Sequence, residues 1–343
     1  MRRLGNTLYV LSEDLYLSLD GENVIAKHSG EIAGRVPLHT LDSIYSFSYM
    51  GASPALMGKC AEEGIGLSFF SPSGKFLASV SGLQHGNVLL RRAQNVVASS
   101  QTLSLSIAKN FILGKIFNCK WVLERCLRDH RMRINADRVY QVFERMTQAL
   151  RATRSCGSTD SLRGIEGDAA SEYFSVFDQL ILNQEPSFVF HGRNRRPPLD
   201  PINAMLSLFY TMLSLDCSSA LYGAGLDPFI GFLHTDKPGR RSLALDCMEE
   251  LRPLLVDRFV VSVVNNHIVK PKDFEKRENG EVRLTSSGRK VLFDAWQTKK
   301  RETITHPYLQ EKISWGLVPY VQAQLLSKYI RGDIDAYPPF LWK

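Results

Sequence analysis

The sequence lacks the cysteine spacing that would indicate a zinc ribbon or a disulfide scaffold. Its six cysteines are scattered along 343 residues and form no Cys-x-x-Cys pair. Disulfide scaffolds concentrate cysteines in short secreted chains, and structural zinc sites use closely spaced pairs. The pattern therefore favours a reducing compartment, and we expect a cytoplasmic protein.

Segments that would enter a membrane are also missing. No uncharged run reaches the roughly 18 residues that a membrane-spanning helix needs. The opening MRRLGNTLYVLSED has two arginines but no long apolar core, since Ser12, Glu13 and Asp14 interrupt it. We therefore expect neither a signal peptide nor a membrane partner.

Two common enzyme motifs are absent as well. There is no Gly-x-x-x-x-Gly-Lys-[Ser/Thr] loop, which argues against nucleotide hydrolysis, and no Gly-x-Ser-x-Gly elbow of a serine hydrolase. What the chain does contain is excess positive charge. Its 42 Lys and Arg against 35 Asp and Glu give a net charge of +7 and a pI near 9.0. This balance favours a polyanionic partner.

Residues 1–82 have the pattern of a small β domain. Short alternating segments are separated by turn residues, and one helix is predicted to begin with Ser53 and Pro54 and to end at Gly64. We expect the aromatic residues of this part to serve its core rather than to stack on bases. With no catalytic cluster in it, the domain is expected to serve assembly or dimerisation.

The rest of the chain has a helical period. A linker is predicted at residues 83–90, followed by a mostly α-helical domain over 91–343 with a short β-hairpin insertion near 274–284. The last helix is expected from Tyr308 to Ile330. The predicted fold class is therefore α+β, with a small β-sandwich-like N-terminal domain and a larger helical C-terminal domain.

One stretch, GFLHTDKPGRRSLALDCMEELRP, brings together a histidine, a basic turn and an acidic helix. The histidine, His234, follows an apolar lead-in. Asp246 lies three residues before Glu249 and four before Glu250, so it shares one helical face with either glutamate. Two carboxylates about 4 Å apart repel by roughly 4 kcal/mol at an effective dielectric of about 20. The pair therefore calls for a cation, a shared proton or solvent.

Two explanations of this stretch stay open. The nearby imidazole, Arg240 and Arg241 indicate a divalent metal that acts on a phosphate, on a helix that Ser242 would cap. A solvated acidic face beside a histidine satisfied in the core explains the same residues. Spacing alone does not decide between them.

A further carboxylate, Glu166, lies between Gly164 and Gly167 in a predicted helix. Each glycine costs roughly 1 kcal/mol against alanine there, which indicates either close approach of a backbone or ligand, or tight helix packing. One nitrogen and several carboxylates suit Mn²⁺ or Mg²⁺ better than Zn²⁺, and such an ion would polarise a phosphodiester. The candidate metal set is Glu166, His234, Asp246, Glu249 and Glu250.

Basic side chains gather in loops and near helix ends. Arginines before a helix N-terminus can hold phosphates, although a solvated loop explains such a run equally well. The candidate phosphate contacts, which the resemblance described next would make DNA contacts, are Arg163, Arg193, Arg195, Arg196, Arg240, Arg241, Lys299, Lys300 and Arg301.

Four motifs in combination carry a resemblance that covers essentially the whole chain. They are residues 164–167 (GIEG), 196–204 (RPPLDPINA), 231–234 (GFLH) and 242–249 (SLALDCME). With these motifs the sequence resembles the CRISPR-associated integrase-endonuclease family, the larger of the two universal spacer-acquisition (adaptation) proteins. It is most similar to the form that accompanies the type I-C interference system.

The resemblance implies a catalytic helical domain with a single-metal site. Its metal ligands would be Glu166, His234 and Glu249, with Mn²⁺ or Mg²⁺ as the cofactor. Asp246 would be an accessory catalytic carboxylate. Glu249 is preferred to Glu250 because it keeps the family's spacing from Asp246.

The resemblance also implies partners and a reaction in antiviral defence. The N-terminal domain would form a homodimer, and two dimers would flank a dimer of a small ferredoxin-like partner protein. The complex would bind single-stranded, double-stranded and branched DNA, and join free 3′ hydroxyls of a captured fragment to a CRISPR repeat by transesterification. Two alternatives are a metal-dependent repair nuclease that cuts branched DNA and a non-catalytic DNA-binding scaffold.

Overall fold

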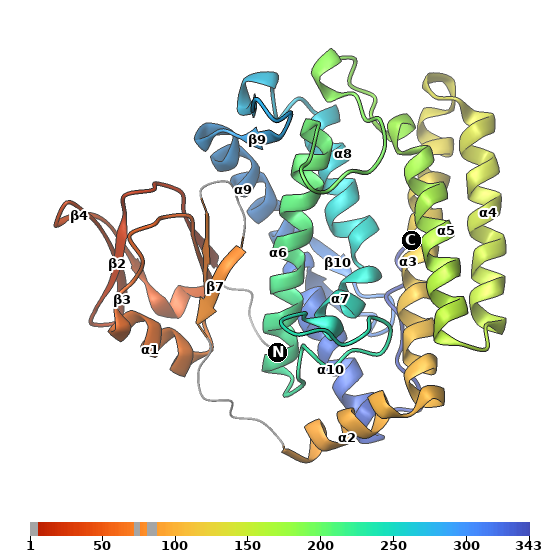
Figure 1. Cartoon of the computed structure of the whole chain (residues 1–343), viewed down its shortest axis with the longest axis horizontal. Helices are drawn as coiled ribbons and strands as arrows, with labels where there is room; N and C mark the ends of the chain where they lie inside the picture. The colour runs from red at the N-terminus through yellow and green to blue at the C-terminus, as the bar shows by residue number, and fades with distance from the viewer. Residues whose placement is uncertain (1–5, 72–75, 81–87) are drawn as a thin grey trace.

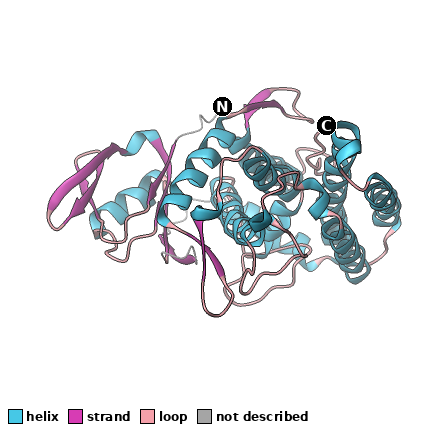
Figure 2. Cartoon of the chain, turned by 90° about the horizontal axis from the view of Figure 1, so that it is seen from above, coloured by secondary structure: helices cyan, strands magenta, loops and turns pink. Residues whose placement is uncertain are grey.

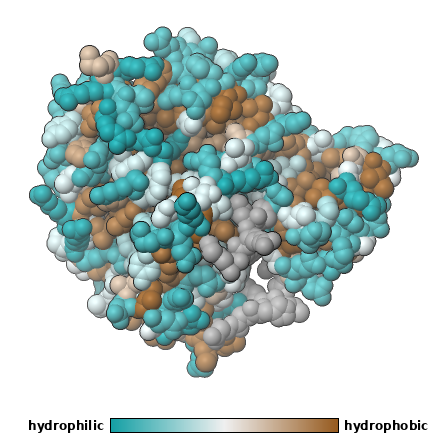
Figure 3. Space-filling view, turned by 180° about the vertical axis from the view of Figure 1, so that it is seen from behind, coloured by the Kyte–Doolittle hydropathy of each residue, from teal (hydrophilic) through white to brown (hydrophobic). Residues whose placement is uncertain are grey.

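The computed structural model describes residues 6–71, 76–80 and 88–343, and it consists of two lobes of unequal size (Figure 1). Most strands lie in the smaller lobe, whereas helices fill the larger one (Figure 2). Seen from behind, the smaller lobe projects from the side of the larger (Figure 3). The predicted α+β class, β-rich first and mostly helical afterwards, is confirmed. Most of the predicted linker falls on residues 81–87, outside the described residues, and the domain boundaries stay a prediction.

Within its described residues, the smaller lobe contains two β-sheets and one α-helix. The four-stranded sheet has the order β1-β5-β6-β7, with β7 antiparallel to β6 and the other pairs parallel. The second sheet is an antiparallel meander of β2, β3 and β4. The elements are β1 (Asn6–Val10), β2 (Tyr16–Asp20), β3 (Asn23–His28), β4 (Glu31–Pro37), β5 (Leu41–Ser46), α1 (Pro54–Glu63), β6 (Gly66–Phe70) and β7 (Phe76–Val80).

Helix α1 begins and ends where the sequence predicts. The Ser53 hydroxyl accepts a hydrogen bond from the backbone N–H of Leu56. Gly64 ends the helix with φ of 70°, a conformation that glycine adopts without the strain a side chain causes. Leu56 and Cys60 are buried between the two sheets, so the helix completes the core of the smaller lobe.

The larger lobe is built from helices around the main hydrophobic core. Helices α3, α4 and α5 lie side by side at the edge away from the smaller lobe (Figure 1). The helices are α2 (Val88–Ser99), α3 (Gln101–His130), α4 (Ala136–Ser155), α5 (Thr159–Ser175), α6 (Pro201–Gly223), α7 (Ser242–Glu249), a π-helical segment (Arg252–Asp257), α8 (Arg258–Asn265), α9 (Ser286–Arg301) and α10 (Val318–Arg331).

Two short strand pairings complete or correct the predicted pattern of the larger lobe. Strands β8 (Phe274–Lys276) and β9 (Val282–Leu284) form the predicted hairpin insertion. Strands β10 (Thr303–Thr305) and β11 (Lys312–Ser314) pair with each other and were not predicted. The predicted start of the last helix near Tyr308 is wrong, because the turn between these strands, β11 and a short 3-10 helix (Trp315–Leu317) occupy the residues before α10.

Aromatic side chains join the two lobes. Tyr9 of β1 stacks on Phe293 of α9 with ring centres 4.3 Å apart, and the Phe47 ring lies 5.3 Å from the same ring. The Tyr45 hydroxyl donates to Asp216 in α6 at 3.0 Å. Tyr45 and Phe47 are buried, so the prediction that aromatic residues of the β-rich part serve the core is confirmed for them.

One helix of the described chain, α6, is long and apolar enough to cross a membrane. The protein itself buries 67% of its most apolar 18-residue window, and Asp216 of this helix forms an ion pair with Lys300 at 3.0 Å. A buried core helix of a soluble protein has the same length and apolar composition. The composition of α6 is therefore only weak evidence for a membrane-spanning segment.

Candidate active site

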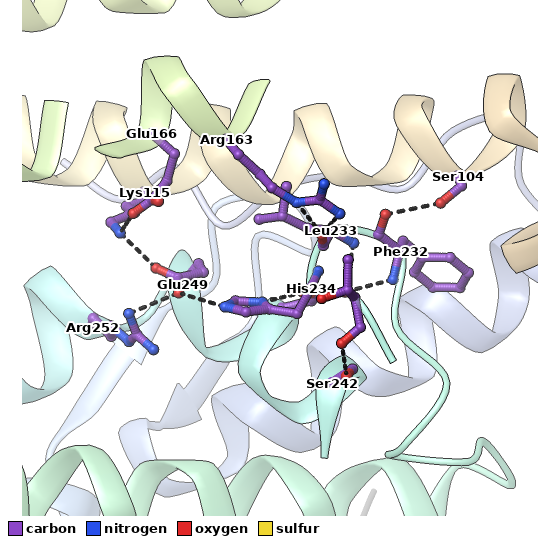
Figure 4. A network of polar contacts seen from close by, with 12 residues as sticks. Ser104, Lys115, Arg163, Glu166, Phe232, Leu233, His234, Ser242, Glu249 and Arg252 are labelled. Carbon is purple, nitrogen blue, oxygen red and sulfur yellow. Dashed lines mark hydrogen bonds and ion pairs between the residues drawn. The ribbon is translucent and has the colours of Figure 1, made fainter. Parts of the chain in front are cut away.

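The chain between α6 and α7 forms an irregular segment that neighbouring helices hold in place (Figure 4). Ser104 of α3 donates a hydrogen bond to the carbonyl oxygen of Phe232 at 2.9 Å. Arg163 of α5 donates to the carbonyl oxygen of Leu233 through Nε at 2.9 Å and Nη2 at 2.7 Å. These side chains fix the backbone just before His234.

Asp246 holds the same segment from α7. Its Oδ2 accepts from the backbone N–H groups of Phe232 and Leu233 at 2.6 and 2.9 Å, and its Oδ1 accepts from that of His234 at 3.0 Å. The same Oδ1 lies 2.6 Å from His234 Nδ1. Because a carboxylate accepts, Nδ1 carries the proton and Nε2 is left to bind a metal or accept a proton. Asp246 is fully buried, and it positions His234 rather than facing the opening of the site.

The segment approaches α7 closely at Gly231. A Cβ at Gly231 would lie 2.7 Å from Ser242 Cβ and 2.9 Å from Asp246 Oδ2, so no side chain fits there. The predicted capping role of Ser242 is wrong. It is the first residue of α7, and its hydroxyl donates to the carbonyl oxygen of Thr235 at 3.2 Å. The residue before the helix, Arg241, provides no side-chain cap.

Lys115 of α3 joins two of the predicted metal ligands. Its Nζ contacts Glu166 Oε1 and lies 2.7 Å from Glu249 Oε2. Glu249 Oε1 lies 2.7 Å from Arg252 Nη1 and 4.0 Å from His234 Nε2. The fold thus brings Glu166, His234 and Glu249 together from α5, the irregular segment and α7 (Figure 4).

The charges of this cluster stabilise one another. Burial alone would raise the pKa of Glu249, but the charges of Arg252 and Lys115 outweigh burial and lower this pKa to about 2. Burial alone would lower the pKa of Lys115, but Glu249 and Glu166 outweigh it and raise that pKa. Two carboxylates about 5 Å apart repel by roughly 3 kcal/mol at an effective dielectric of about 20. A cation between them removes that repulsion.

The donor set fits a hard divalent cation. One imidazole nitrogen and two carboxylates make an oxygen-rich site, and the buried Glu249 Oε2 already faces a cation, the ammonium group of Lys115 at 2.7 Å. Among the described residues no group of three His, Cys, Asp or Glu side chains is spaced to hold a metal. Lys115 lies between Glu166 and Glu249, so holding a metal requires these carboxylates to turn toward His234.

A tyrosine ring connects the cluster to the basic loop before α6. The guanidinium carbons of Arg252 and Arg193 lie 5.2 and 5.5 Å from the centre of the Tyr210 ring, within the range of cation–π contacts. The Tyr210 hydroxyl donates to the buried Asp257. Burial raises the pKa of Asp257 to about 6, against the opposing effects of Tyr210, Arg252 and Arg193. Arg252 therefore contacts both Glu249 and the Tyr210 ring, and the same ring contacts Arg193 of the basic loop.

The predicted DNA contacts differ in exposure. Arg195 and Arg196 are exposed. Arg241 lies against the smaller lobe, with its guanidinium carbon 4.6 Å from the Phe76 ring centre. Lys300 is buried in its ion pair with Asp216, so its assignment as a surface DNA contact is wrong. The predicted contacts that are partly or fully exposed also include Arg163, Arg193, Arg240, Lys299 and Arg301.

Gly164 and Gly167 flank Glu166 without packing against anything. A Cβ at either position would meet no atom within 4 Å. Tight helix packing and close approach of another backbone, both considered from the sequence, are therefore wrong explanations. The approach of a ligand beside Glu166 stays a prediction.

Glu250 faces away from the cluster, toward the C-terminal tail. Its Oε1 accepts from the Tyr337 hydroxyl and from Gln322, and its Oε2 accepts from the backbone N–H of Phe340 at 2.7 Å. The contacts of Glu250 thus anchor the tail, while those of Glu249 lie within the cluster. This geometry supports the choice of Glu249 over Glu250.

We expect Glu250 to make stability fall as pH rises from about 4.5 to about 7. Burial raises its pKa from 4.5 to about 7, although its hydrogen bonds oppose the rise. In this window the folded protein holds a proton that the unfolded chain has released, so the free energy of unfolding decreases with pH, by about 3 kcal/mol in total. Above pH 7 both states are ionised and the contribution is constant.

Urea denaturation of wild type and Glu250→Gln between pH 4.5 and 8 measures this effect. The variant is expected to lose this part of the pH dependence, whatever its absolute stability. Because Asp257 acts in the same direction below about pH 6, the difference between the two proteins is the quantity to compare. Equal slopes between pH 6 and 7 would contradict the assignment.

The profile of the family described as CRISPR associated protein Cas1 matches residues 8–298. The chain belongs to the Cas1 family. The family predicted from the four sequence motifs is thereby confirmed.

Relatives in the Cas1 family match over the full length of the chain. CRISPR-associated endonuclease Cas1 2 of Rhodospirillum rubrum is 48% identical over 347 residues, and CRISPR-associated endonuclease Cas1 1 of Chlorobaculum tepidum is 43% identical over 343 residues. Both alignments cover 100% of each chain.

Two solved structures share the fold. A casposase bound to integration product has a TM-score of 0.84 at 22% identity, with 98% of this chain and 93% of that chain covered. A Cas1 protein from Thermotoga maritima has a TM-score of 0.80 at 22% identity, with 95% and 97% covered. At these identities the likeness establishes the common Cas1 fold.

The sequence pattern did not reveal two charged residues of this cluster, Lys115 and Arg252. Lys115 lies in the apolar stripe of α3, and a lysine within such a stripe is itself a signal, because buried lysines need a partner. Arg252 follows Glu249 by three residues, a spacing at which helical side chains meet. Both signals are present in the sequence, but neither shows that Lys115 and Arg252 converge on Glu249.

Proposed function

We propose that this chain is a metal-dependent DNA endonuclease and integrase of CRISPR adaptation. It joins the 3′ hydroxyl ends of a captured DNA fragment to a CRISPR repeat by transesterification. The observation that carries the proposal is the convergence of Glu166, His234 and Glu249 beside Lys115 and Arg252. Full-length relatives named CRISPR-associated endonucleases and the shared fold of a casposase bound to integration product support it.

The contacts of each side chain indicate its role. Glu166, His234 and Glu249 would hold Mn²⁺ or Mg²⁺, which suit their donor set. When bound, such an ion supplies Lewis-acid stabilisation of charge on the phosphodiester oxygens. Asp246 orients His234 through Nδ1, and Arg252 adds a fixed positive charge where negative charge develops on the phosphate.

We propose a partner complex on the same grounds. A chain of a Cas6-RT-Cas1–Cas2 complex shares the fold with a TM-score of 0.82, and the match covers 36% of that longer chain. The proposed assembly is a homodimer through the smaller lobe, bound to a small ferredoxin-like partner, in a type I-C-like adaptation module in the cytoplasm. Its substrates would be single-stranded, double-stranded and branched DNA and the CRISPR repeat.

A strand-transfer assay tests the reaction. The chain, with and without the small partner, is incubated with a labelled short duplex, a supercoiled plasmid that carries a CRISPR repeat, and either Mn²⁺ or a chelator. We expect label to become joined to the plasmid at the repeat only in Mn²⁺.

Two other results would point to the alternatives. Cleavage of branched DNA without joining, even with the partner present, would indicate a repair nuclease. DNA binding without any metal-dependent cleavage or joining would indicate a non-catalytic scaffold. Either result would overturn the proposed function.

A further inference from the structure

Lys115 lies on the buried face of α3, and most of its neighbours on that face are apolar. Phe111 and Cys119, one turn away on either side, are buried, and so are Ile112 and Ile116. Lys115 itself is only 8% exposed. A charge in these surroundings destabilises the fold unless it is paired.

The partners of Lys115 are two of the three predicted metal ligands. Its Nζ contacts Glu166 Oε1 from α5 and lies 2.7 Å from Glu249 Oε2 from α7. One ammonium group thus links α3, α5 and α7 at the point where the two carboxylates converge (Figure 4). Its positive charge offsets the repulsion between the Glu166 and Glu249 carboxylates, as a bound metal ion would.

We propose that Lys115 is an internal cation that holds Glu166 and Glu249 in the metal-free protein and releases them when a divalent cation binds. This inference rests on the proposed function, in which the same two carboxylates hold the metal. Lys115 is then a positioning residue. It keeps the metal-free site assembled and limits the affinity of the site for divalent ions.

Lys115 and a divalent cation compete for the same carboxylate groups. The ammonium group uses Glu166 Oε1 and Glu249 Oε2, and both carboxylates must turn from it to meet a cation beside His234. The displaced ammonium group stays nearby, because Lys115 is enclosed by the core of the larger lobe. A positive charge this close to a divalent ion weakens its binding.

A second buried lysine offers a matched control. Lys300 is 7% exposed and pairs with Asp216 at 3.0 Å, in the region where the two lobes meet. Its pair includes no predicted metal ligand. Removing the charge of Lys300 therefore disturbs a buried ion pair without changing competition at the site.

The test measures Mn²⁺ binding by isothermal titration calorimetry and thermal unfolding with chelator or Mn²⁺. Wild type, Lys115→Met and Lys300→Met are compared. We expect Lys115→Met to bind Mn²⁺ about tenfold more tightly than wild type. It is also expected to melt at a lower temperature in chelator and to gain more from Mn²⁺. Lys300→Met is expected to melt lower but to keep wild-type affinity.

Other outcomes of these measurements decide for or against the proposed role of Lys115. Unchanged or weaker Mn²⁺ binding by Lys115→Met, with normal binding by wild type, overturns this inference and leaves the proposed function intact. If wild type binds no Mn²⁺, the metal dependence in the proposed function fails as well. Folding of Lys115→Met only in Mn²⁺ supports the inference. Failure of both Lys115→Met and Lys115→Gln to fold in saturating Mn²⁺ overturns it.

Discussion

Replacing Glu166 by glutamine is expected to reduce strand transfer by at least about 1,000-fold. Glutamine keeps the shape of the side chain but removes the negative charge, so the proposed metal loses one of its three ligands. Loss of charge stabilisation worth about 4 kcal/mol at the transition state corresponds to this factor. Glu166 is 26% exposed, so we expect the fold to survive the change. His234→Ala is expected to have a similar effect, and the rate of joined-product formation is the measurement.

The matched control for Glu166→Gln lies on the same helix. Asp168 is exposed and two residues away, so Asp168→Asn removes an equal charge from α5 without touching the predicted ligand set. Its strand transfer is expected to stay within about threefold of wild type, because a charge on the solvated face is largely screened. Retention of more than a tenth of the activity by Glu166→Gln would sink the site assignment. Loss of DNA binding would instead indicate a role in substrate affinity.

Asp246→Ala is expected to lower both stability and activity. The substitution leaves the backbone N–H groups of Phe232, Leu233 and His234 without their acceptor, two of them in buried surroundings. Unsatisfied buried donors cost about 1–3 kcal/mol each, so we expect a loss of about 3–5 kcal/mol in the free energy of unfolding. The imidazole of His234 also loses the bond that orients it. We expect strand transfer to fall about 100-fold, in line with the loss of an orienting partner of a metal ligand.

Urea denaturation and the strand-transfer rate, measured below the melting temperature, separate these two effects. Asp236→Ala provides the comparison, because Asp236 is an exposed carboxylate two residues after His234 in the same irregular segment. It is expected to change stability by less than about 0.5 kcal/mol. If Asp246→Ala were as stable as Asp236→Ala, the buried hydrogen bonds assigned to Asp246 would not contribute as described.

Local patterns in the sequence predicted the elements whose ends depend on neighbouring residues. Helix α1 begins after Ser53 and ends before Gly64, because a hydroxyl cap and a residue that tolerates positive φ act within one turn. The hairpin near 274–284 was predicted for the same reason, from the turn residues between β8 and β9. The start of α10 was not, because the pairing of β10 with β11 removes residues before Val318 from a helix that their sequence allows.

In the candidate site, too, local sequence predicts one part of the arrangement and tertiary packing decides the other. Spacing placed Asp246 on one helical face with both Glu249 and Glu250, and this much is a property of the helix itself. Which glutamate faces the histidine depends on what packs around α7. The C-terminal tail takes Glu250, and α3 with α5 surrounds Glu249.

The sequence by itself determined the α+β class, the ends of several elements, the Cas1 family and the residue types of the candidate site. These depend on periodicity, capping chemistry and motifs, all of which are read within short segments. Only the tertiary structure decided that Asp246 stands behind His234, that Gly164 and Gly167 face open space, and that Lys115 lies between the two glutamates. A helical period indicates which side chains face the core. The residues that these side chains contact lie on segments far along the chain, and only the packing of those segments brings them together.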